Sequence, residues 1–462
     1  MPSGPESFVS HPAYVPEFTH ARELLLAHPG RWRVIYHYDG DGIASASSAL
    51  RALQRLGYPA QASPLVGVER PRMAELLDAT KGPVLIVDTG ASWLDLAASH
   101  GAPVIVLDHH KFPATTALPE HVAFVNPLNW GVDGMSELCA ATLTWLFTIH
   151  LDPMNWDNAP FGLSGAIADR QHVGGFRGLN AKLVEEAVLR SLVTRRSALP
   201  LFGASVADAL SRSIDPYFTG LSGRIDEARR LLDGLGIDPS RPPATLAAAD
   251  ERKLTNVLVA RMVHQGTRPE FREILTQERW SLPTLGLDAQ ELSNLQNATG
   301  RIGEPGVGIA LALGDAEALA RARAAEETWR SGVLTGLRRI EDGGVNSRKA
   351  VQWFESAETT LAGTQAGLAM NYLLDSRRPV FVFSQGAGSI KLSGRGTNWL
   401  VSQGLDLSIV CRDAALAVRG EGGGHRVASG ATIPPGTRDA FLDEADRLVG
   451  LQLKFPPAEV AA

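Results

Sequence analysis

Cysteine, basic leader sequence and long apolar runs are all scarce in this chain. Its 462 residues include only two cysteines, Cys139 and Cys411, too few for a disulfide framework or a cysteine-based zinc site. No apolar run approaches the ~20 residues of a membrane-spanning helix. Met1–Phe8 lacks the basic and then apolar pattern of a secretion signal. We therefore expect a cytoplasmic protein that does not enter a membrane.

The chain also lacks an excess of positive charge. Its 44 Lys and Arg stand against 50 Asp and Glu, which gives a net charge of −6. This balance excludes a uniformly basic nucleic-acid-binding surface, but not a local basic groove. Arg provides 37 of the basic residues; a bias in the coding sequence explains this more simply than a need for bidentate phosphate contacts. The length favours about two to four domains.

Short apolar runs alternate with helical patterns in the first part of the chain. The runs are bounded by Gly, Pro and Asp, as is typical of strands buried on both faces. Because strands and helices alternate, we predict a parallel, doubly wound α/β sheet. The predicted strands are Val34–Tyr36, Val84–Val87, Val104–Leu107 and Val122–Val125, and the predicted helices are Ile43–Leu56, Trp93–Ser99 and Leu138–Ile149.

The rest of the chain divides into a mainly helical part and a second mixed part. Helices are predicted over Ala204–Ile214, Gly223–Leu235, Glu251–Gln265 and Asp315–Arg339, with a Gly-rich segment, Asn297–Gly308, between the last two. Further on, strands are predicted over Ala350–Phe354, Val380–Phe383 and Ser389–Leu392, and helices over Gly363–Leu374 and Asp439–Gly450. We expect a parallel α/β domain (1–194), a helical connector (195–345) and a smaller mixed α/β domain (346–462) across a cleft from the first.

Asp and His residues gather where the first three predicted strands end. The first strand runs into His37-Tyr38-Asp39-Gly40-Asp41-Gly42, the second into Asp88, and the third into Asp108-His109-His110. Carboxyl ends of parallel strands share one sheet edge, so these side chains should converge. Each alone is most simply a turn or cap residue, but three successive strands ending in this way indicate a metal site. Asp169 is a further candidate.

The residue types indicate the metal and its use. Asp and His together suit Mn²⁺ or Mg²⁺. Their number suits two ions, which at about 3.5–4 Å apart can clamp the attacking and leaving oxygens of a phosphate ester. Asn126 follows the fourth strand at the same edge and is a candidate for substrate contact.

In this order, the strand-end motifs and Asp169 resemble those of the DHH phosphoesterase superfamily. Gly422-Gly423-Gly424-His425 resembles the GGGH signature of its DHHA1 domain. Two further segments, Asn297-Ala298-Thr299-Gly300-Arg301 and Ser393-Gly394-Arg395, resemble segments of RecJ-type nucleases. The resemblance runs from about residue 34 to residue 450.

The resemblance implies a role for each matching residue. Asp39 and Asp88 would hold one ion, with His37 as a further candidate, and the second ion would be held by Asp41, Asp88, His109 and Asp169. Asp108 would orient the two histidines, and His110 would face the scissile phosphate. The residues implied or placed to bind substrate are Asn126, Asn297, Arg301, Ser393, Arg395, Gly422, Gly423, Gly424 and His425.

The function implied is that of a RecJ-like exonuclease, a hydrolase that degrades single-stranded DNA or RNA from an end by two-metal activation of water. Replication or repair proteins are candidate partners, and the compact form resembles archaeal RecJ-like proteins. Two alternatives remain. One is a small-molecule phosphodiesterase for oligoribonucleotides, cyclic dinucleotides or phosphorylated adenosine nucleotides. The other is a non-enzymatic replisome scaffold related to RecJ, which would not need the full set of metal ligands present here.

Overall fold

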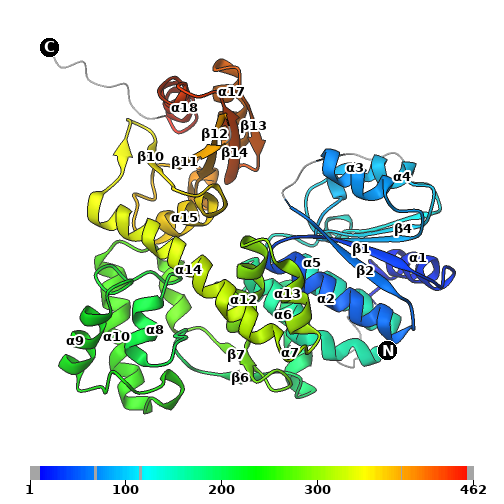
Figure 1. Cartoon of the computed structure of the whole chain (residues 1–462), viewed down its shortest axis with the longest axis horizontal. Helices are drawn as coiled ribbons and strands as arrows, with labels where there is room; N and C mark the ends of the chain where they lie inside the picture. Colours follow the sequence, from blue (N-terminus) through cyan, green and yellow to red (C-terminus); the bar gives the residue numbers. More distant parts are fainter. Residues whose placement is uncertain (1–10, 67–69, 114–116, 387, 455–462) are drawn as a thin grey trace. The chain divides into compact units, whose positions relative to one another are not determined.

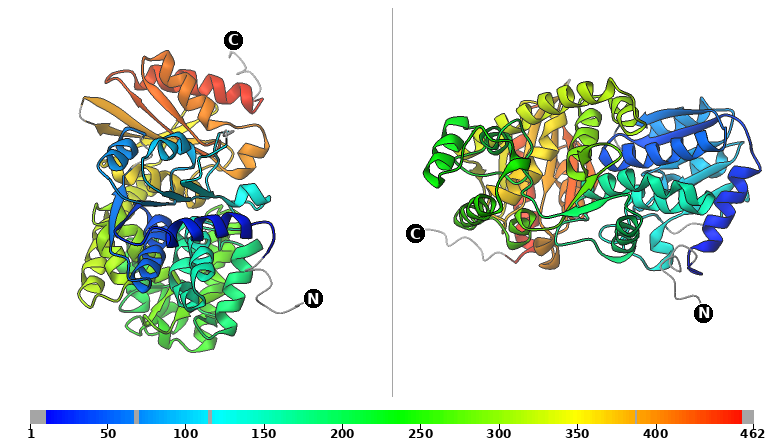
Figure 2. Two further views of the ribbon diagram at one scale, coloured as in Figure 1. Left: turned by 90° about the vertical axis from the view of Figure 1, so that its right-hand side faces the viewer. Right: turned by 90° about the horizontal axis from the view of Figure 1, so that it is seen from below.

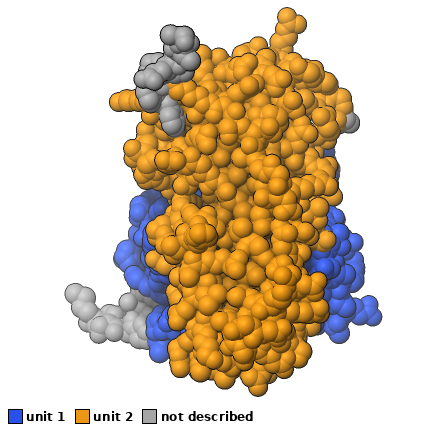
Figure 3. Space-filling model, turned by 90° about the vertical axis from the view of Figure 1, so that its left-hand side faces the viewer, with its two compact units in different colours: residues 1–198, 277–328 blue, residues 199–276, 329–462 orange. Residues whose placement is uncertain are grey.

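A computed structural model describes residues 11–66, 70–113, 117–386 and 388–454 (Figure 1). The chain forms two compact units, each made from two stretches of sequence (Figure 3). Unit 1 comprises residues 1–198 and 277–328, and unit 2 comprises residues 199–276 and 329–462. The predicted connector (195–345) does not form a unit of its own: its residues 277–328 belong to unit 1, and its residues 199–276 and 329–345 belong to unit 2.

Unit 1 is built around a five-stranded sheet in the order β2-β1-β3-β4-β5. All its neighbouring strands are parallel, which confirms the predicted α/β class and parallel sheet. The strands are β1 (Trp32–His37), β2 (Ala60–Leu65), β3 (Val84–Val87), β4 (Val104–Leu107) and β5 (Val122–Val125). Strand β2 is not predicted from the sequence because Ser63 and Pro64 interrupt its apolar pattern. Pro64 is tolerated there because β2 is an edge strand.

Helices cover both faces of this sheet (Figures 1 and 2). Alternate strand residues point to opposite faces, so Tyr36 and Val87 pack in one core with α1, α2 and α5, while Ile35 and Ile86 pack in another with α3 and α4. Strands β3 and β4 are buried throughout, as their unbroken apolar runs predict. The helices are α1 (Val15–Leu26), α2 (Gly40–Arg55), α3 (Arg70–Asp78), α4 (Leu94–Ser99) and α5 (Ala140–Leu151).

Most of the Gly-rich segment Asn297–Gly308, which lies between two predicted helices, is itself helical. It spans the end of α12 (Ala289–Arg301), a short turn at residues 302–304 and the start of α13 (Pro305–Ala312). Two of its glycines serve close packing: a Cβ on Gly300 would lie 1.8 Å from the carbonyl oxygen of Tyr38, and one on Gly308 would lie 2.6 Å from Thr299 Oγ1. Unit 1 is completed by α6 (Ala159–Ala168), α7 (Gly178–Leu189), β6 (Thr194–Arg196), β7 (Arg279–Leu282) and β8 (Leu287–Asp288).

Unit 2 joins a helical part to a mixed sheet in the order β13-β14-β12-β11-β10-β9. In this sheet β10 and β11 pair in parallel and the other pairs are antiparallel, as expected of a mixed α/β domain. The strands are β9 (Asn346–Ser347), β10 (Gln352–Glu355), β11 (Val380–Gly386), β12 (Ser389–Arg395), β13 (Glu421–Gly424) and β14 (Ala428–Ile433).

Within the described residues, five of the eight helices that surround this sheet or precede it overlap predicted helices, whereas Pro269–Arg272, Asn398–Ser402 and Leu407–Ala417 are not predicted. The eight are α8 (Val206–Arg212), α9 (Ile225–Leu235), α10 (Ala248–His264), α11 (Pro269–Arg272), α15 (Thr359–Tyr372), α16 (Asn398–Ser402), α17 (Leu407–Ala417) and α18 (Arg438–Gln452). The long helix α14 (Ala318–Gly343) contributes residues to both units. Across the described residues, no helix combines the length and apolar character needed to cross a membrane.

Candidate metal centre

The candidate site lies at the carboxyl edge of the parallel sheet of unit 1. Strand β1 ends at His37, Asp88 follows β3, and Asp108 follows β4. These three strands are neighbours, and the strand order reverses between β1 and β3. At such a reversal the loops diverge in opposite directions and leave room for a ligand. The convergence predicted from the strand ends is therefore present in the structure.

Two glycines fold the first loop tightly. A Cβ on Gly42 would lie 2.0 Å from the carbonyl oxygen of His37, and a Cβ on Gly40 would lie 2.7 Å from the Cβ of Ala168. Helix α2 therefore starts directly after β1, with Asp39 as its N-cap and Asp41 in its first turn. The amino end of a helix favours negative charge, which helps to hold two carboxylates there.

The first group of candidate ligands is His37, Asp39 and Asp88, whose ligand atoms lie within 4.8 Å of one another. His37 Nδ1 lies 3.0 Å from Asp39 Oδ1 and 3.5 Å from Asp88 Oδ2. Burial alone would raise the pKa of Asp39, but His37 outweighs it and holds that pKa below its usual range. The structure thus places His37 with the two carboxylates predicted to share an ion.

The second group is Asp41, His109 and Asp169. His109 Nε2 lies 3.4 Å from Asp88 Oδ1 and 3.8 Å from Asp41 Oδ2, so Asp88 lies against both groups. His109 Nδ1 is 2.6 Å from the carbonyl oxygen of Gly134. A proton on Nδ1 donated to this carbonyl leaves the Nε2 lone pair for a metal ion, which is the usual arrangement for a metal-binding histidine.

Asp41 is fixed by the amino end of α5. Its carboxylate accepts hydrogen bonds from the backbone N–H groups of Ala140 and Ala141, at 3.0 and 2.9 Å. Burial, with repulsion from Asp88 and Asp169, nevertheless raises the pKa of Asp41 well above its usual value. The two backbone N–H groups therefore hold the carboxylate in position, but they do not offset the burial and repulsion that oppose its negative charge.

The residues fit divalent metal ions by two tests. Asp88 is 3% exposed, and its Oδ1 accepts no hydrogen bond from the described residues, although buried oxygens are normally hydrogen-bonded. Burial, with repulsion from Asp88 and Asp39, raises the pKa of Asp169 to about 6, and a bound cation would favour its charged form. Asp88 also adopts the left-handed backbone conformation (φ +58°), which is uncommon outside glycine and recurs at functional sites.

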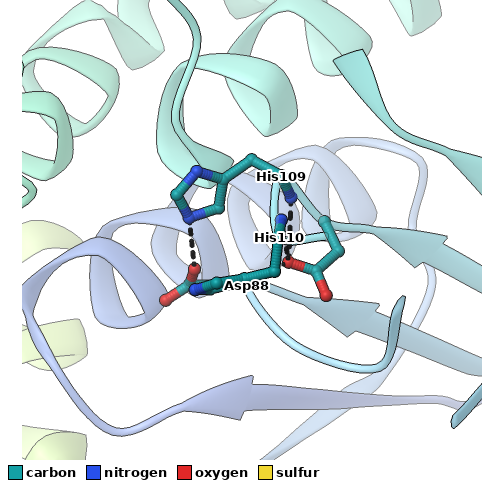
Figure 4. A group of neighbouring side chains, drawn as sticks. Asp88, His109 and His110 are labelled. Carbon is teal, nitrogen blue, oxygen red and sulfur yellow. Dashed lines mark hydrogen bonds and ion pairs between the residues drawn. The ribbon is translucent and has the colours of Figure 1, made fainter. Parts of the chain in front are cut away.

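Asp108 holds the histidine pair from behind. Its Oδ1 is 2.8 Å from His110 Nδ1 and accepts the backbone N–H of His109 at 2.8 Å, while its Oδ2 accepts the N–H of Ala91. Burial opposes charge on His110, but Asp108 outweighs it and raises the pKa of His110. Figure 4 shows His109 facing Asp88, with His110 beside them. The four residues Asp88, Asp108, His109 and His110 form one close group.

The Asn297–Arg301 segment lies against the first loop. Arg301 Nη1 donates a hydrogen bond to the Tyr38 hydroxyl at 2.7 Å, and its Nη2 lies 3.9 Å from Asp39 Oδ2. The Cβ of Asn297 is 3.3 Å from where a Cβ on Gly40 would lie. The segment predicted to bind substrate is therefore adjacent to the first group of ligands.

Asn126 lies at the predicted sheet edge but does not offer a surface to substrate. It is fully buried, its Nδ2 donates to the carbonyl oxygen of His110 at 3.0 Å, and its Oδ1 accepts the N–H of Leu128. Its amide is thus used to hold the loop that carries His110. Position at the sheet edge alone did not distinguish this role from substrate contact.

Ser393 and Arg395 lie together on β12 of unit 2, beside α15. A Cβ on Gly363 of α15 would lie 3.0 Å from Arg395 Nη2 and 3.7 Å from Ser393 Oγ. Arg395 Nη1 also donates to the carbonyl oxygen of Gly394 at 2.9 Å. The two predicted substrate-binding side chains are therefore on one face of the same strand.

Gly422, Gly423 and Gly424 lie in strand β13. A Cβ on Gly422 would lie 2.4 Å from the carbonyl oxygen of Cys411, so this glycine lets β13 approach α17. A Cβ on Gly423 would meet nothing within 4 Å. His425 follows the strand and is exposed, and its carbonyl accepts the Ser429 hydroxyl.

Three residues near the metal groups were not found from the sequence. Gly134 lies against His109, and a Cβ on it would be 2.3 Å from the His109 carbonyl oxygen. Gln171 donates hydrogen bonds to Asp169 and to the Gly134 carbonyl, and Asn180 donates to Gln171. The only sequence signal is that Gln171 is two positions after Asp169.

Comparison with known proteins agrees with this site. Residues 31–168 match the family model for the DHH family, N-terminal domain, and residues 349–451 match that for the DHHA1 domain. The chain therefore belongs to the DHH/DHHA1 phosphoesterase superfamily, whose DHH family comprises metal-dependent phosphoesterases.

Among individual proteins, an uncharacterized protein of Methanocaldococcus jannaschii is 26% identical over 444 residues, covering 94% of this chain and 96% of that protein. RecJ of Thermus thermophilus in complex with Mn²⁺ has a similar structure, with a TM-score of 0.60 at 22% identity over 96% of this chain; the match spans only 55% of that RecJ chain. CDC45 of Entamoeba histolytica gives a TM-score of 0.64 at 10% identity, over 94% and 99% of the two chains. At these identities the structural likeness establishes the fold.

Proposed function

We propose that this protein hydrolyses single-stranded nucleic acid from an end, using two Mn²⁺ or Mg²⁺ ions. The observation that carries the proposal is the pair of ligand groups, His37/Asp39/Asp88 and Asp41/His109/Asp169, with Asp88 against both. Two solved structures with this fold are described as RecJ bound to manganese and RecJ in complex with Mg²⁺. The RecJ likeness and the RecJ-like segments support nucleic acid as the substrate.

When bound, such ions activate water and neutralise charge on phosphate oxygens. The carboxylates of Asp39, Asp41, Asp88 and Asp169 would hold them, together with the Nε2 atom of His109 and a nitrogen of His37. Five of these six side chains lie at the end of β1, at the start of α2, or directly after β3 or β4, so the sheet fixes their spacing. No serine or cysteine nucleophile is needed.

His110 is placed to supply a proton. Asp108 accepts from its Nδ1 and favours the charged imidazolium, which carries a second proton on Nε2. That Nε2–H can donate to a phosphate oxygen or to the leaving oxygen, as a general acid does. Asp108 is a positioning residue in this scheme, since it also fixes the backbone of His109.

Arg301 and the unit 2 residues are the proposed phosphate contacts. Arg301 is close to Asp39 and presents a guanidinium suited to bidentate phosphate binding. Ser393 and Arg395 form a second polar pair on β12. Strand β13 is at the edge of its sheet, and edge strands leave backbone N–H groups without a strand partner. Gly423, which has open space on its side-chain position, would let a phosphate approach that backbone.

The decisive experiment compares four substrates under identical Mn²⁺: a 5′-phosphorylated single-stranded 20-mer, its blunt duplex, a 5′-phosphorylated dinucleotide and a cyclic dinucleotide. We expect stepwise degradation of the 20-mer to mononucleotides, little cleavage of the duplex, and no activity after EDTA treatment. Labels at either end, on DNA and on RNA, give the polarity and the sugar preference.

Each alternative has its own signature in this assay. Rates on the dinucleotide or cyclic dinucleotide that are orders of magnitude above those on the 20-mer would identify a small-molecule phosphodiesterase instead. Absence of hydrolysis of every substrate with Mn²⁺ bound would favour the scaffold. Arg301→Ala should weaken 20-mer binding by about 10- to 150-fold, the loss of a charge-assisted hydrogen bond. Arg321→Ala, which removes an exposed guanidinium of the same unit, is the matched control.

A further inference from the structure

One side-chain amide connects the supports of two candidate ligands. Gln171 Nε2 donates to the carbonyl oxygen of Gly134 and to Asp169 Oδ2, each at 2.8 Å. The same Gly134 carbonyl lies 2.6 Å from Nδ1 of His109. One hydrogen of the Gln171 NH₂ group therefore binds Asp169 directly. The other binds the Gly134 carbonyl, which in turn contacts His109.

Asn180 supports the orientation that the two acceptors give to this amide. Asn180 Nδ2 lies 2.6 Å from Gln171 Oε1 and donates to it. If the Gln171 amide turned over, its NH₂ would face the Asn180 NH₂ and its oxygen would face two acceptors. Asn180 is fully buried, its own N–H donates to the carbonyl of Glu137, and its Oδ1 has no hydrogen-bond partner among the described residues. This orphaned oxygen is a stability cost of keeping Asn180 there.

The backbone keeps these partners in register. The N–H of Gln171 donates to the carbonyl of Ala166 at the end of α6, and Arg170 before it has a left-handed φ of +60°. Gly134 approaches His109 so closely that a Cβ would lie 2.3 Å from its carbonyl oxygen. The segment between β5 and α5, which carries Gly134, is thus tied at Gln171 to the end of α6 and the start of α7.

We propose that Gln171 and Asn180 are positioning residues for one metal position, that of His109 and Asp169. Gln171 holds Asp169 Oδ2 and, by binding Gly134, holds the carbonyl that fixes the tautomer of His109. Neither residue hydrogen-bonds His37 or Asp39 within the described chain, so the other metal position should be insensitive to them. This inference rests on the metal-dependent function proposed above.

The test measures Mn²⁺ binding to the variants Gln171→Met and Asn180→Ala by calorimetric titration and by electron paramagnetic resonance. Met keeps the length of Gln but donates nothing. We expect one of the two Mn²⁺ affinities to fall by about 10- to 100-fold, the usual effect of losing a partner behind a ligand, while the other stays within about 2-fold. The spectrum of a coupled Mn²⁺ pair should give way to that of a single ion. Asn180→Ala should weaken the same position by less.

Gln352→Met is the matched control, because Gln352 in unit 2 is also buried and its Nε2 donates to two carbonyls, those of Asp375 and Arg378. It should bind both ions as wild type does. If folded Gln171→Met and Asn180→Ala bind both Mn²⁺ ions with wild-type affinity, the inference is wrong. An equal loss of Mn²⁺ affinity at both metal positions would also overturn it. Wild-type protein that binds no Mn²⁺ would overturn the proposed function itself, and this inference with it.

Discussion

Replacement of Asp88 by Asn tests the metal centre most directly. The backbone of residue 88 has φ +58°, a conformation that Asn adopts readily, so the substitution should not strain the loop. It removes the attraction between Asp88 and the two histidines beside it, His37 and His109. It also removes repulsion on Asp41 and Asp169. Because these effects oppose each other, we expect the free energy of unfolding of the metal-free protein to change by about 1 kcal/mol or less.

Metal binding should change far more than stability. Asp88 lies against both ligand groups, so its loss removes a ligand from each. Losing even a partner behind a ligand costs about 10- to 100-fold in affinity, and loss of the shared carboxylate should cost at least the upper figure. At a Mn²⁺ concentration 100 times the wild-type Kd, each bound ion stabilises the wild type by about 2.7 kcal/mol, and the variant by only about 0.4 kcal/mol.

Thermal unfolding with Mn²⁺ or with EDTA, together with hydrolysis of the single-stranded 20-mer, measures both effects. Asp88→Asn should show almost no Mn²⁺-dependent rise in Tm and no turnover. Asp95→Asn is the matched control, since Asp95 is an exposed carboxylate of the same unit, paired with Arg70, and its loss should leave both readouts unchanged. A variant at position 88 that binds two Mn²⁺ ions with wild-type affinity would refute the assignment.

Three further predictions concern pH and packing. Burial raises the pKa of Asp169 to about 6, and the neighbouring carboxylates, Asp88 foremost, raise the pKa of His109 despite its burial. Between pH 8 and pH 5 the folded metal-free protein therefore binds more protons than the unfolded chain. Its free energy of unfolding, measured with urea, should rise as the pH falls from 8 to 5, and its Mn²⁺ affinity should decrease over the same range. Gly300→Ala should lower the free energy of unfolding by about 1–3 kcal/mol or more, because its Cβ would lie 1.8 Å from a carbonyl oxygen. Gly422→Ala should destabilise unit 2 in thermal unfolding, whereas Gly423→Ala, with open space around it, should not.

The parallel sheet could be predicted from sequence because its central strands are buried on both faces. Strands β3 and β4 have unbroken apolar runs, and each is followed by Asp. Strand β2 lies at the edge and carries polar residues, so nothing in its composition separates it from a loop. The glycines of α12 and α13 resemble a loop in sequence, yet their absent side chains let these helices pack closely against α2 and the loop before it. Such tertiary demands leave no local pattern.

The candidate ligands could be predicted because topology alone brings strand ends together. The residues behind them could not. Gln171 and Gly134 act through single hydrogen bonds between segments whose separation in sequence follows no rule. The same limit explains Asn126: its place at the sheet edge was evident, but whether its amide faces substrate or the backbone of His110 depends on one rotamer.

The return of residues 277–328 to unit 1 has a consequence for the order of biosynthesis. A ribosome completes the five-stranded parallel sheet and every candidate metal ligand by residue 169, yet the helix that carries Arg301 emerges more than a hundred residues later. Until α12 has been synthesised, the core of unit 1 lacks Leu292 and Leu295, which are buried in it in the complete protein. A fragment ending at residue 198 should therefore expose apolar surface and aggregate, whereas a fusion of residues 1–198 to 277–328 through a short flexible linker should stay folded and bind Mn²⁺.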